Sequence, residues 1–232
     1  MPGRNHLFEE GGYYHVYNKT IDEKRPFESE RNCKIFLHMM WFYRNDEHRI
    51  SHSKFLNFPP EAQAIWVPTI NNSENSKVDV LAYCLMPTHY HLLLREKRKG
   101  GISGYMSKLQ NAFTRYYNLK NRRAGQMFRG HFKSKPLASE ETFKHVARYI
   151  HLNPYSSGIV NTKRELKEHP WSSLRELFTP DSLKASQTTN KDALLSFFND
   201  DVDSYMKFLM DQVDYQRTLE TCKSVEKFFA RQ

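Results

Sequence analysis

The chain has 232 residues, with 35 Lys and Arg against 26 Asp and Glu, which gives a formal net charge of +9. Its 39% hydrophobic and 14% aromatic content suffices for a packed core and excludes wholesale disorder. Cys33, Cys84 and Cys222 lie far apart, which excludes a disulfide framework or a cysteine-rich zinc site and suits a reducing compartment. No apolar run approaches the ~18 residues of a membrane span, and no signal peptide is evident. We therefore expect a soluble cytoplasmic protein that makes no membrane contact.

The excess positive charge is concentrated in the centre of the chain. Residues 97–151 contain thirteen Lys and Arg against two acidic residues, Glu140 and Glu141, and the segments on either side are each close to neutral. Such clustering is typical of a polyanion site, because neutralising phosphates releases their counterions. A solvated basic face without a partner is the alternative.

The first half of the chain predicts strands around one helix. β-forming residues predict a strand over 12–20, and apolar residues at helical spacing predict a helix over 28–44. Residues 45–77 are expected to form a loop or insertion, in which 64–67 has the composition of a short strand. The apolar run 78–94, interrupted by Pro-Thr, predicts two adjacent central strands, or one bent strand, buried on both faces.

The next part predicts helix, strand and helix. Helices are expected over 102–121 and 139–152, the second ended by Asn153-Pro154, with a short strand or extended segment within 128–137. This order of elements suggests an α+β fold, an antiparallel or mixed sheet with helices packed on one face.

A helical extension is expected at the C-terminal end. Helices are predicted over 192–198, 203–213 and 219–229, and the polar residues 180–190 are predicted to be a linker.

Two histidines on one predicted strand form a candidate metal site. His89 and His91 are two residues apart, so a strand places both imidazoles on one face, while Tyr90 points to the other. Neutral imidazoles can bind a divalent cation, and two of them leave most of a Mg²⁺ or Mn²⁺ shell open for a phosphate oxygen. Surface or hydrogen-bonded histidines are the alternative.

Tyr149 is a candidate nucleophile on the helix predicted over 139–152. It lies at the border of the apolar stripe of that helix and shares a face with His145 and Asn153. A phenolate can attack phosphorus and form a covalent phosphotyrosine, and a nearby cation would help to form the phenolate. Asn153 could add a carboxamide oxygen as a third metal ligand. The alternative is a tyrosine packed at the edge of the core with its hydroxyl in water.

Five strings, in this order along the chain, resemble the insertion-sequence-200-like transposases. The resemblance is closest to the REP-associated tyrosine transposases and spans about residues 12–173. Its strings are Tyr14-His-Val-Tyr-Asn-Lys19, Leu81-Ala-Tyr-Cys-Leu-Met-Pro-Thr-His-Tyr-His-Leu-Leu-Leu94, Gln126-Met-Phe-Arg-Gly-His-Phe-Lys-Ser134, Arg148-Tyr-Ile-His-Leu-Asn-Pro154 and Pro170-Trp-Ser-Ser173.

The resemblance implies a ferredoxin-like domain with His89 and His91 as metal ligands, Tyr149 as nucleophile and Asn153 as third ligand. Insertion-sequence members commonly carry Gln at the position of Asn153. Members of the family cleave single-stranded DNA beside a hairpin, hold it as a 5′-phosphotyrosine and rejoin it to a 3′-OH. We therefore expect a transposase in the cytoplasm, associated with the nucleoid. Its expected partner is single-stranded DNA with hairpins, from repetitive palindromes or transposon ends.

Residues 1–175 are assigned to the transposase domain and 176–232 to the C-terminal extension. The 45–77 insertion and the extension depart from the small family members. The chain is expected to be either a monomer or a homodimer. Eight basic residues are expected to track phosphates. They are Lys108, Arg115, Lys120, Arg122, Arg123, Arg129, Lys133 and Lys135.

Four aromatic residues near the basic segment have two interpretations. Either they stack on unpaired bases or they belong to the core, which is the commoner role. They are Tyr116, Tyr117, Phe128 and Phe132.

Two other functions fit parts of the pattern. One is a domesticated, inactive domain that binds a DNA or RNA hairpin. The other is a metal-dependent hydrolase that uses water, which leaves Tyr149 unexplained. The presence of His89, His91 and Tyr149 together favours the transposase.

Overall fold

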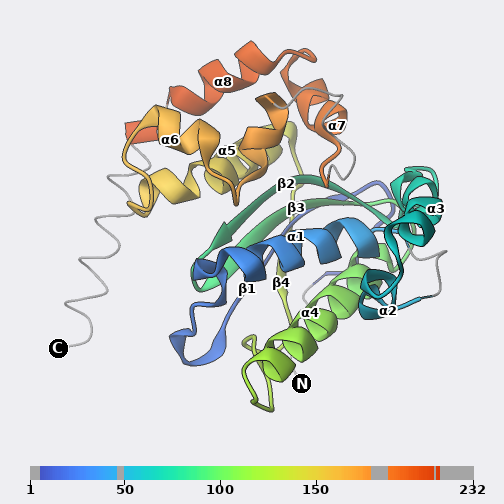
Figure 1. Ribbon diagram of the computed structural model, residues 1–232. Helices are drawn as coiled ribbons and strands as arrows, with labels where there is room; N and C mark the ends of the chain where they lie inside the picture. Colours follow the sequence, from blue (N-terminus) through green and yellow to red (C-terminus); the bar gives the residue numbers. More distant parts are fainter. Residues whose placement is uncertain (1–5, 46–49, 179–187, 212, 215–232) are drawn as a thin grey trace.

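The computed structural model describes residues 6–45, 50–178, 188–211 and 213–214, and within them four antiparallel strands form one sheet (Figure 1). The strands are β1 (Tyr13–Lys19), β2 (Val78–Met86), β3 (His89–Glu96) and β4 (Lys133–Pro136), in the order β2-β3-β1-β4. With α1 (Glu30–Tyr43) after β1 and α4 (Gly101–Lys120) after β3, the chain has a βαββαβ order. That order is ferredoxin-like, which confirms the predicted α+β antiparallel fold.

The helices cover both faces of the sheet, where the prediction placed them on one. Helices α1 and α4 pack on the face that includes Val16 and Leu92, and α5 (Glu140–Ser156) packs on the face that includes Leu93 (Figure 1). Leu92 and Leu93 are both fully buried although they point to opposite faces. The continuous apolar run of the two central segments is the physical reason, because such a sheet exposes neither face.

The outer edge of β2 is covered by a later segment of the chain. The Leu85 amide donates to the Trp171 carbonyl at 2.9 Å, and the Tyr83 amide donates to Ser173 Oγ at 2.8 Å. The Asn190 amide donates to the Val80 carbonyl at 2.8 Å. These backbone groups of the edge strand are thus paired within the chain.

The 45–77 insertion contains two helices, α2 (His52–Leu56) and α3 (Pro60–Asn71), so the expected strand at 64–67 is wrong. Pro60 occupies the first turn of α3, where its missing N–H costs no hydrogen bond. Ile70 and Phe55 are buried in the same core as α1. Helical packing therefore outweighs the local β-propensity.

Helix α5 continues through Pro154 to Ser156, beyond the predicted end at residue 152. Pro154 lies in the last turn of α5, so the hydrogen bond that its missing N–H removes is one of the last in the helix. The Ser157 amide donates to the Asn153 carbonyl and closes the turn. The remaining elements are α6 (Lys163–Glu168), α7 (Lys191–Leu195), α8 (Val202–Met210) and the 3₁₀ turns Ile21–Glu23, Pro26–Glu28, Ser173–Phe178 and Ser196–Phe198.

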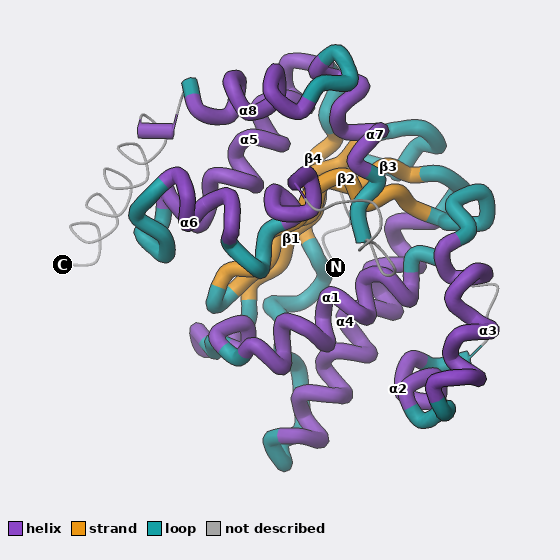
Figure 2. Tube along the Cα trace, turned by 45° about the horizontal axis from the view of Figure 1, so that its top comes forward, coloured by secondary structure: helices purple, strands orange, loops and turns teal. Residues whose placement is uncertain are grey.

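Helices α7 and α8 confirm two of the three helices predicted at the C-terminal end, and they lie beside α5 above the sheet (Figure 2). The helix predicted over 219–229 and most of the linker predicted over 180–190 lie outside the described residues. The division at residue 175 stays a prediction. None of the helices described in the structure is long and apolar enough to cross a membrane.

Buried polar contacts fasten α8 to α5. His151 is fully buried, and its Nδ1 pairs with Tyr205 Oη of α8 while its Nε2 lies 2.7 Å from Ser173 Oγ. Arg148 donates to the Phe208 carbonyl at 3.2 Å, and its guanidinium lies 4.2 Å from the centre of the Phe208 ring. The position of the helix that carries Tyr149 is therefore fixed from above by the C-terminal part of the chain.

Candidate active site

Strand register brings three histidines to one face of the sheet. His91 of β3 pairs with Tyr17 of β1, and Leu93 pairs with His15, so the side chains of His15, Tyr17 and His91 point the same way. The ring centres of His89 and His91 are 5.0 Å apart, and those of His15 and His91 are 5.1 Å apart. The predicted placement of the two β3 histidines on a shared face is confirmed.

Tyr149 of α5 lies directly over these histidines. Its ring centre is 5.3 Å from that of His91 and 5.9 Å from that of His15, both in edge-on arrangements. The side chain is half-buried at the margin of the α5 core, as its place in the helical pattern predicts. The structure thus assembles Tyr149 with the histidine pair, although about sixty residues separate them in the sequence.

Asn153 lies one turn beyond Tyr149 and is largely buried. Its Nδ2 donates to the Tyr149 carbonyl at 2.7 Å, which fixes the carboxamide against its own helix. No contact between Asn153 and the histidines is described, so its predicted role as a third ligand stays a prediction.

His91 has one partnered and one unpartnered ring nitrogen. Its Nδ1 lies 2.9 Å from His15 Nε2, whereas its Nε2 is buried without any hydrogen-bond partner. A buried polar atom without a partner is costly, and an ion or a water molecule is the usual explanation. A cation on Nε2 requires the proton to reside on Nδ1, and Nδ1 can then donate to His15.

Burial keeps these imidazoles neutral near pH 7. It lowers the pKa of His91 well below its usual 6.5, and the adjacent His15 and His89 lower it further. Burial followed by the charge of Lys19 lowers the pKa of His89 to about 4, and burial followed by Lys135 lowers that of His15 to about 4. Neutral imidazoles present the lone pairs that a metal ligand needs.

The protein donors fit an open, weakly held cation. No group of three or more His, Cys, Asp or Glu residues suited to a metal ion occurs among the described residues. The nitrogen donors on this face are imidazoles, and the predicted ligands His89 and His91 are two of them. Such a set leaves room for substrate oxygens, unlike a closed structural zinc site.

Sequence reasoning did not identify His15 as a site residue. Its only local signal is its position in a strand, on the same side as Tyr13 and Tyr17. Its contact with His91 depends on the pairing of β1 with β3, which joins segments 76 residues apart.

The predicted basic residues fall into two groups. In β4, Lys133 pairs with Tyr17 and Lys135 pairs with His15, so both lysines point to the face that holds the histidines and Tyr149. The other six lie on α4, at its C-terminal end or in the segment before β4, and the structure does not bring the α4 residues to Tyr149. These six are Lys108, Arg115, Lys120, Arg122, Arg123 and Arg129.

The four aromatic residues considered for base stacking belong to the core or pack against it. Phe128 and Phe132 are buried in the core beneath α1 and α4. Tyr116 and Tyr117 are partly buried against the same core. The core interpretation is therefore the one that the structure favours.

Comparisons with known proteins agree with this geometry. The family model described as "Transposase IS200 like" matches residues 34–153, more than half of the chain. No curated protein matches. A solved structure of a REP-associated tyrosine transposase bound to a REP hairpin superimposes with a TM-score of 0.50 at 13% sequence identity. That match covers 82% of this chain and 93% of the other, and at this identity it supports the fold. The chain belongs to the IS200-like transposase family.

Proposed function

We propose that the protein cleaves and rejoins single-stranded DNA beside a hairpin, with Tyr149 as nucleophile and a divalent cation, Mg²⁺ or Mn²⁺, held by His89 and His91. The observation that carries the proposal is the position of Tyr149, 5.3 Å ring to ring from His91, whose buried Nε2 lacks a partner. The hairpin bound by the structurally similar protein supports the choice of substrate.

Tyr149 would act through its phenolate oxygen. Oη attacks a backbone phosphorus, an O–P bond forms, and the bond from phosphorus to the 3′ oxygen breaks. The 3′ oxygen leaves and takes a proton, while the 5′ phosphate stays on the tyrosine. Attack of a 3′-OH on that phosphotyrosine reverses the exchange, and no ATP is needed because the number of phosphate ester bonds is conserved.

His89 and His91, with Asn153 as the proposed third donor, would hold the cation beside the scissile phosphate. Bound there, the cation supplies charge stabilisation to a non-bridging phosphate oxygen. Lys133 and Lys135 on the same face would neutralise neighbouring phosphates, and the six remaining basic residues would extend this track around the sheet.

The test is an adduct assay with wild-type protein and a DNA hairpin that carries single-stranded flanks. We expect a covalent protein–DNA band with Mg²⁺ or Mn²⁺ that EDTA prevents. Strand cleavage without an adduct would support the water-using hydrolase. Hairpin binding without either, across palindromes from the flanking genome, would support the inactive binding module.

His15 provides a separate test of the cation site. His15→Phe removes the acceptor for His91 Nδ1 and should weaken Mn²⁺ binding about 10–100-fold, the usual effect of losing a partner that orients a ligand. His15→Gln offers an oxygen acceptor in a similar place and should lose less. Calorimetry of Mn²⁺ binding gives the result without DNA. Tyr17→Phe is the matched control on the same face of β1. Wild-type affinity in His15→Phe would contradict the role of His15.

A further inference from the structure

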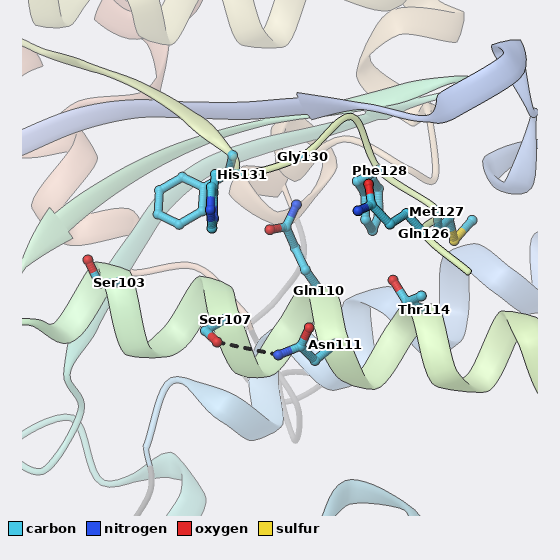
Figure 3. A pocket seen from close by; sticks show the side chains of 11 residues that line it. Ser103, Ser107, Gln110, Asn111, Thr114, Gln126, Met127, Phe128, Gly130 and His131 are labelled. Atoms are coloured by element: carbon cyan, nitrogen blue, oxygen red, sulfur yellow. Dashed lines mark hydrogen bonds between the residues drawn. The ribbon is translucent and has the colours of Figure 1, made fainter. Parts of the chain in front are cut away.

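A groove of about 420 Å³ lies between α4 and residues 126–132 (Figure 3). It belongs to the α1–α4 side of the sheet, because Phe128 and Phe132 on its wall are part of that core. Tyr149 lies over the opposite face. The groove is therefore separate from the candidate active site.

The lining of the groove combines amide and hydroxyl groups and the imidazole of His131 with an aromatic wall. Ser107, Gln110, Asn111 and Thr114 project from α4, and Phe128 lies across from them (Figure 3). No Lys, Arg, Asp or Glu lines it. A free ion is thus a poor occupant. A flat, neutral group with donors and acceptors along its edge fits this chemistry.

Two carboxamides of the groove are already oriented. Gln110 Nε2 donates to Tyr90 Oη at 2.9 Å, and Tyr90 is fully buried within the core. Asn111 Nδ2 donates to Ser107 Oγ at 3.4 Å, a weaker contact that orients this amide along α4. Each carboxamide has one N–H engaged within the protein, which leaves its carbonyl oxygen and its second N–H for a ligand. A carboxamide with one donor and one acceptor free matches the hydrogen-bonding edge of a base.

Basic side chains lie beside the groove but do not line it. Lys108 and Arg115 are exposed on α4, and Arg129 is exposed on the segment that forms the opposite wall. A sugar-phosphate backbone outside a groove that holds a base would meet these charges. The edge strand β4 continues from the same segment and carries Lys133 and Lys135 toward the Tyr149 face.

We propose that this groove binds one unpaired base of the DNA, and that the DNA strand passes around the β4 edge between the groove and Tyr149. The inference rests on the proposed function, since it names a further contact of the same substrate. It assigns a role to the exposed basic residues of α4, which do not reach Tyr149. They would contact the DNA on the side of the protein sheet opposite Tyr149.

The test measures DNA affinity by fluorescence anisotropy, in EDTA, with hairpins whose single-stranded flanks carry one abasic site at each position in turn. Asn111→Ala removes an acceptor from the groove and should weaken binding of intact DNA roughly tenfold, the scale of one base contact. Asn121→Ala is the matched control, because Asn121 is an exposed amide at the end of α4 outside the groove.

The decisive result is a lack of additivity at one flank position. An abasic site there should weaken wild-type binding, yet should cost the Asn111→Ala protein nothing further. Equal losses for both proteins at every position, or equal affinities of Asn111→Ala and Asn121→Ala, would overturn the proposal. The adduct assay at Tyr149 is independent, so failure of the chemistry and failure of the groove give different results.

Discussion

Tyr149→Phe should abolish the covalent protein–DNA adduct, with a fall in strand cleavage of at least about 10³-fold, because phenylalanine lacks the Oη that attacks phosphorus. The phenylalanine ring preserves the edge-on contacts with His91 and His15, so folding and hairpin binding should stay at the wild-type level. Denaturing gels report the adduct, and gel shifts of the same samples report binding.

Tyr17→Phe is a demanding control for this experiment. The Tyr17 ring also lies on the histidine face, with its centre 5.9 Å from that of His91, so it is a second phenol near the same site. The Tyr17→Phe protein should retain its adduct. An adduct that persists in Tyr149→Phe and disappears in Tyr17→Phe would move the nucleophile from α5 to β1 and contradict the proposed function.

Acidification from pH 7 to about 4.5 should markedly reduce the free energy of unfolding. Burial lowers the pKa of His52 and of His151 to about 3, and that of His169 to about 4. In the unfolded chain each titrates near 6.5. Between these values the unfolded state binds more protons than the folded state, so stability falls as the pH falls through this window. Each histidine contributes a slope of about 1.36 kcal/mol per pH unit within it.

Urea unfolding at several pH values, in EDTA, measures this slope. His52→Phe should reduce it by about one proton, because the His52 ring packs against the rings of Phe42 and Tyr43, where a phenyl ring can replace the imidazole without titrating. A free energy of unfolding that stays flat down to pH 4.5, or an unchanged slope in His52→Phe, would contradict the account of the buried imidazoles.

Local patterns predict the parts of this protein that depend on neighbouring residues. Alternation and apolar runs locate β1, β2 and β3, and the spacing of His89 and His91 places both on one face. The helical stripe of α5 places Tyr149 at the border of the core. Each of these inferences needs only the period of a strand or a helix.

What the sequence did not reveal depends on contacts between distant segments. His15 becomes part of the site through the register of β1 against β3, which no local pattern specifies. The strand expected at 64–67 is helical because Ile70 and Phe55 reach the core near α1. The groove beside α4 exists only once residues 126–132 return across that helix.

The strand β4 has a second consequence for this protein, which concerns association with other chains. Among the strands that the structure describes it is the last one on its side of the sheet, and such edges invite pairing with a strand of another molecule. Its shortness, Lys133, Lys135 and the terminal Pro136 all oppose that pairing. The lysines proposed to contact phosphates thus also protect against aggregation. Replacing them with glutamine, which keeps the edge polar, separates loss of DNA contact from loss of solubility, whereas valine would confound the two.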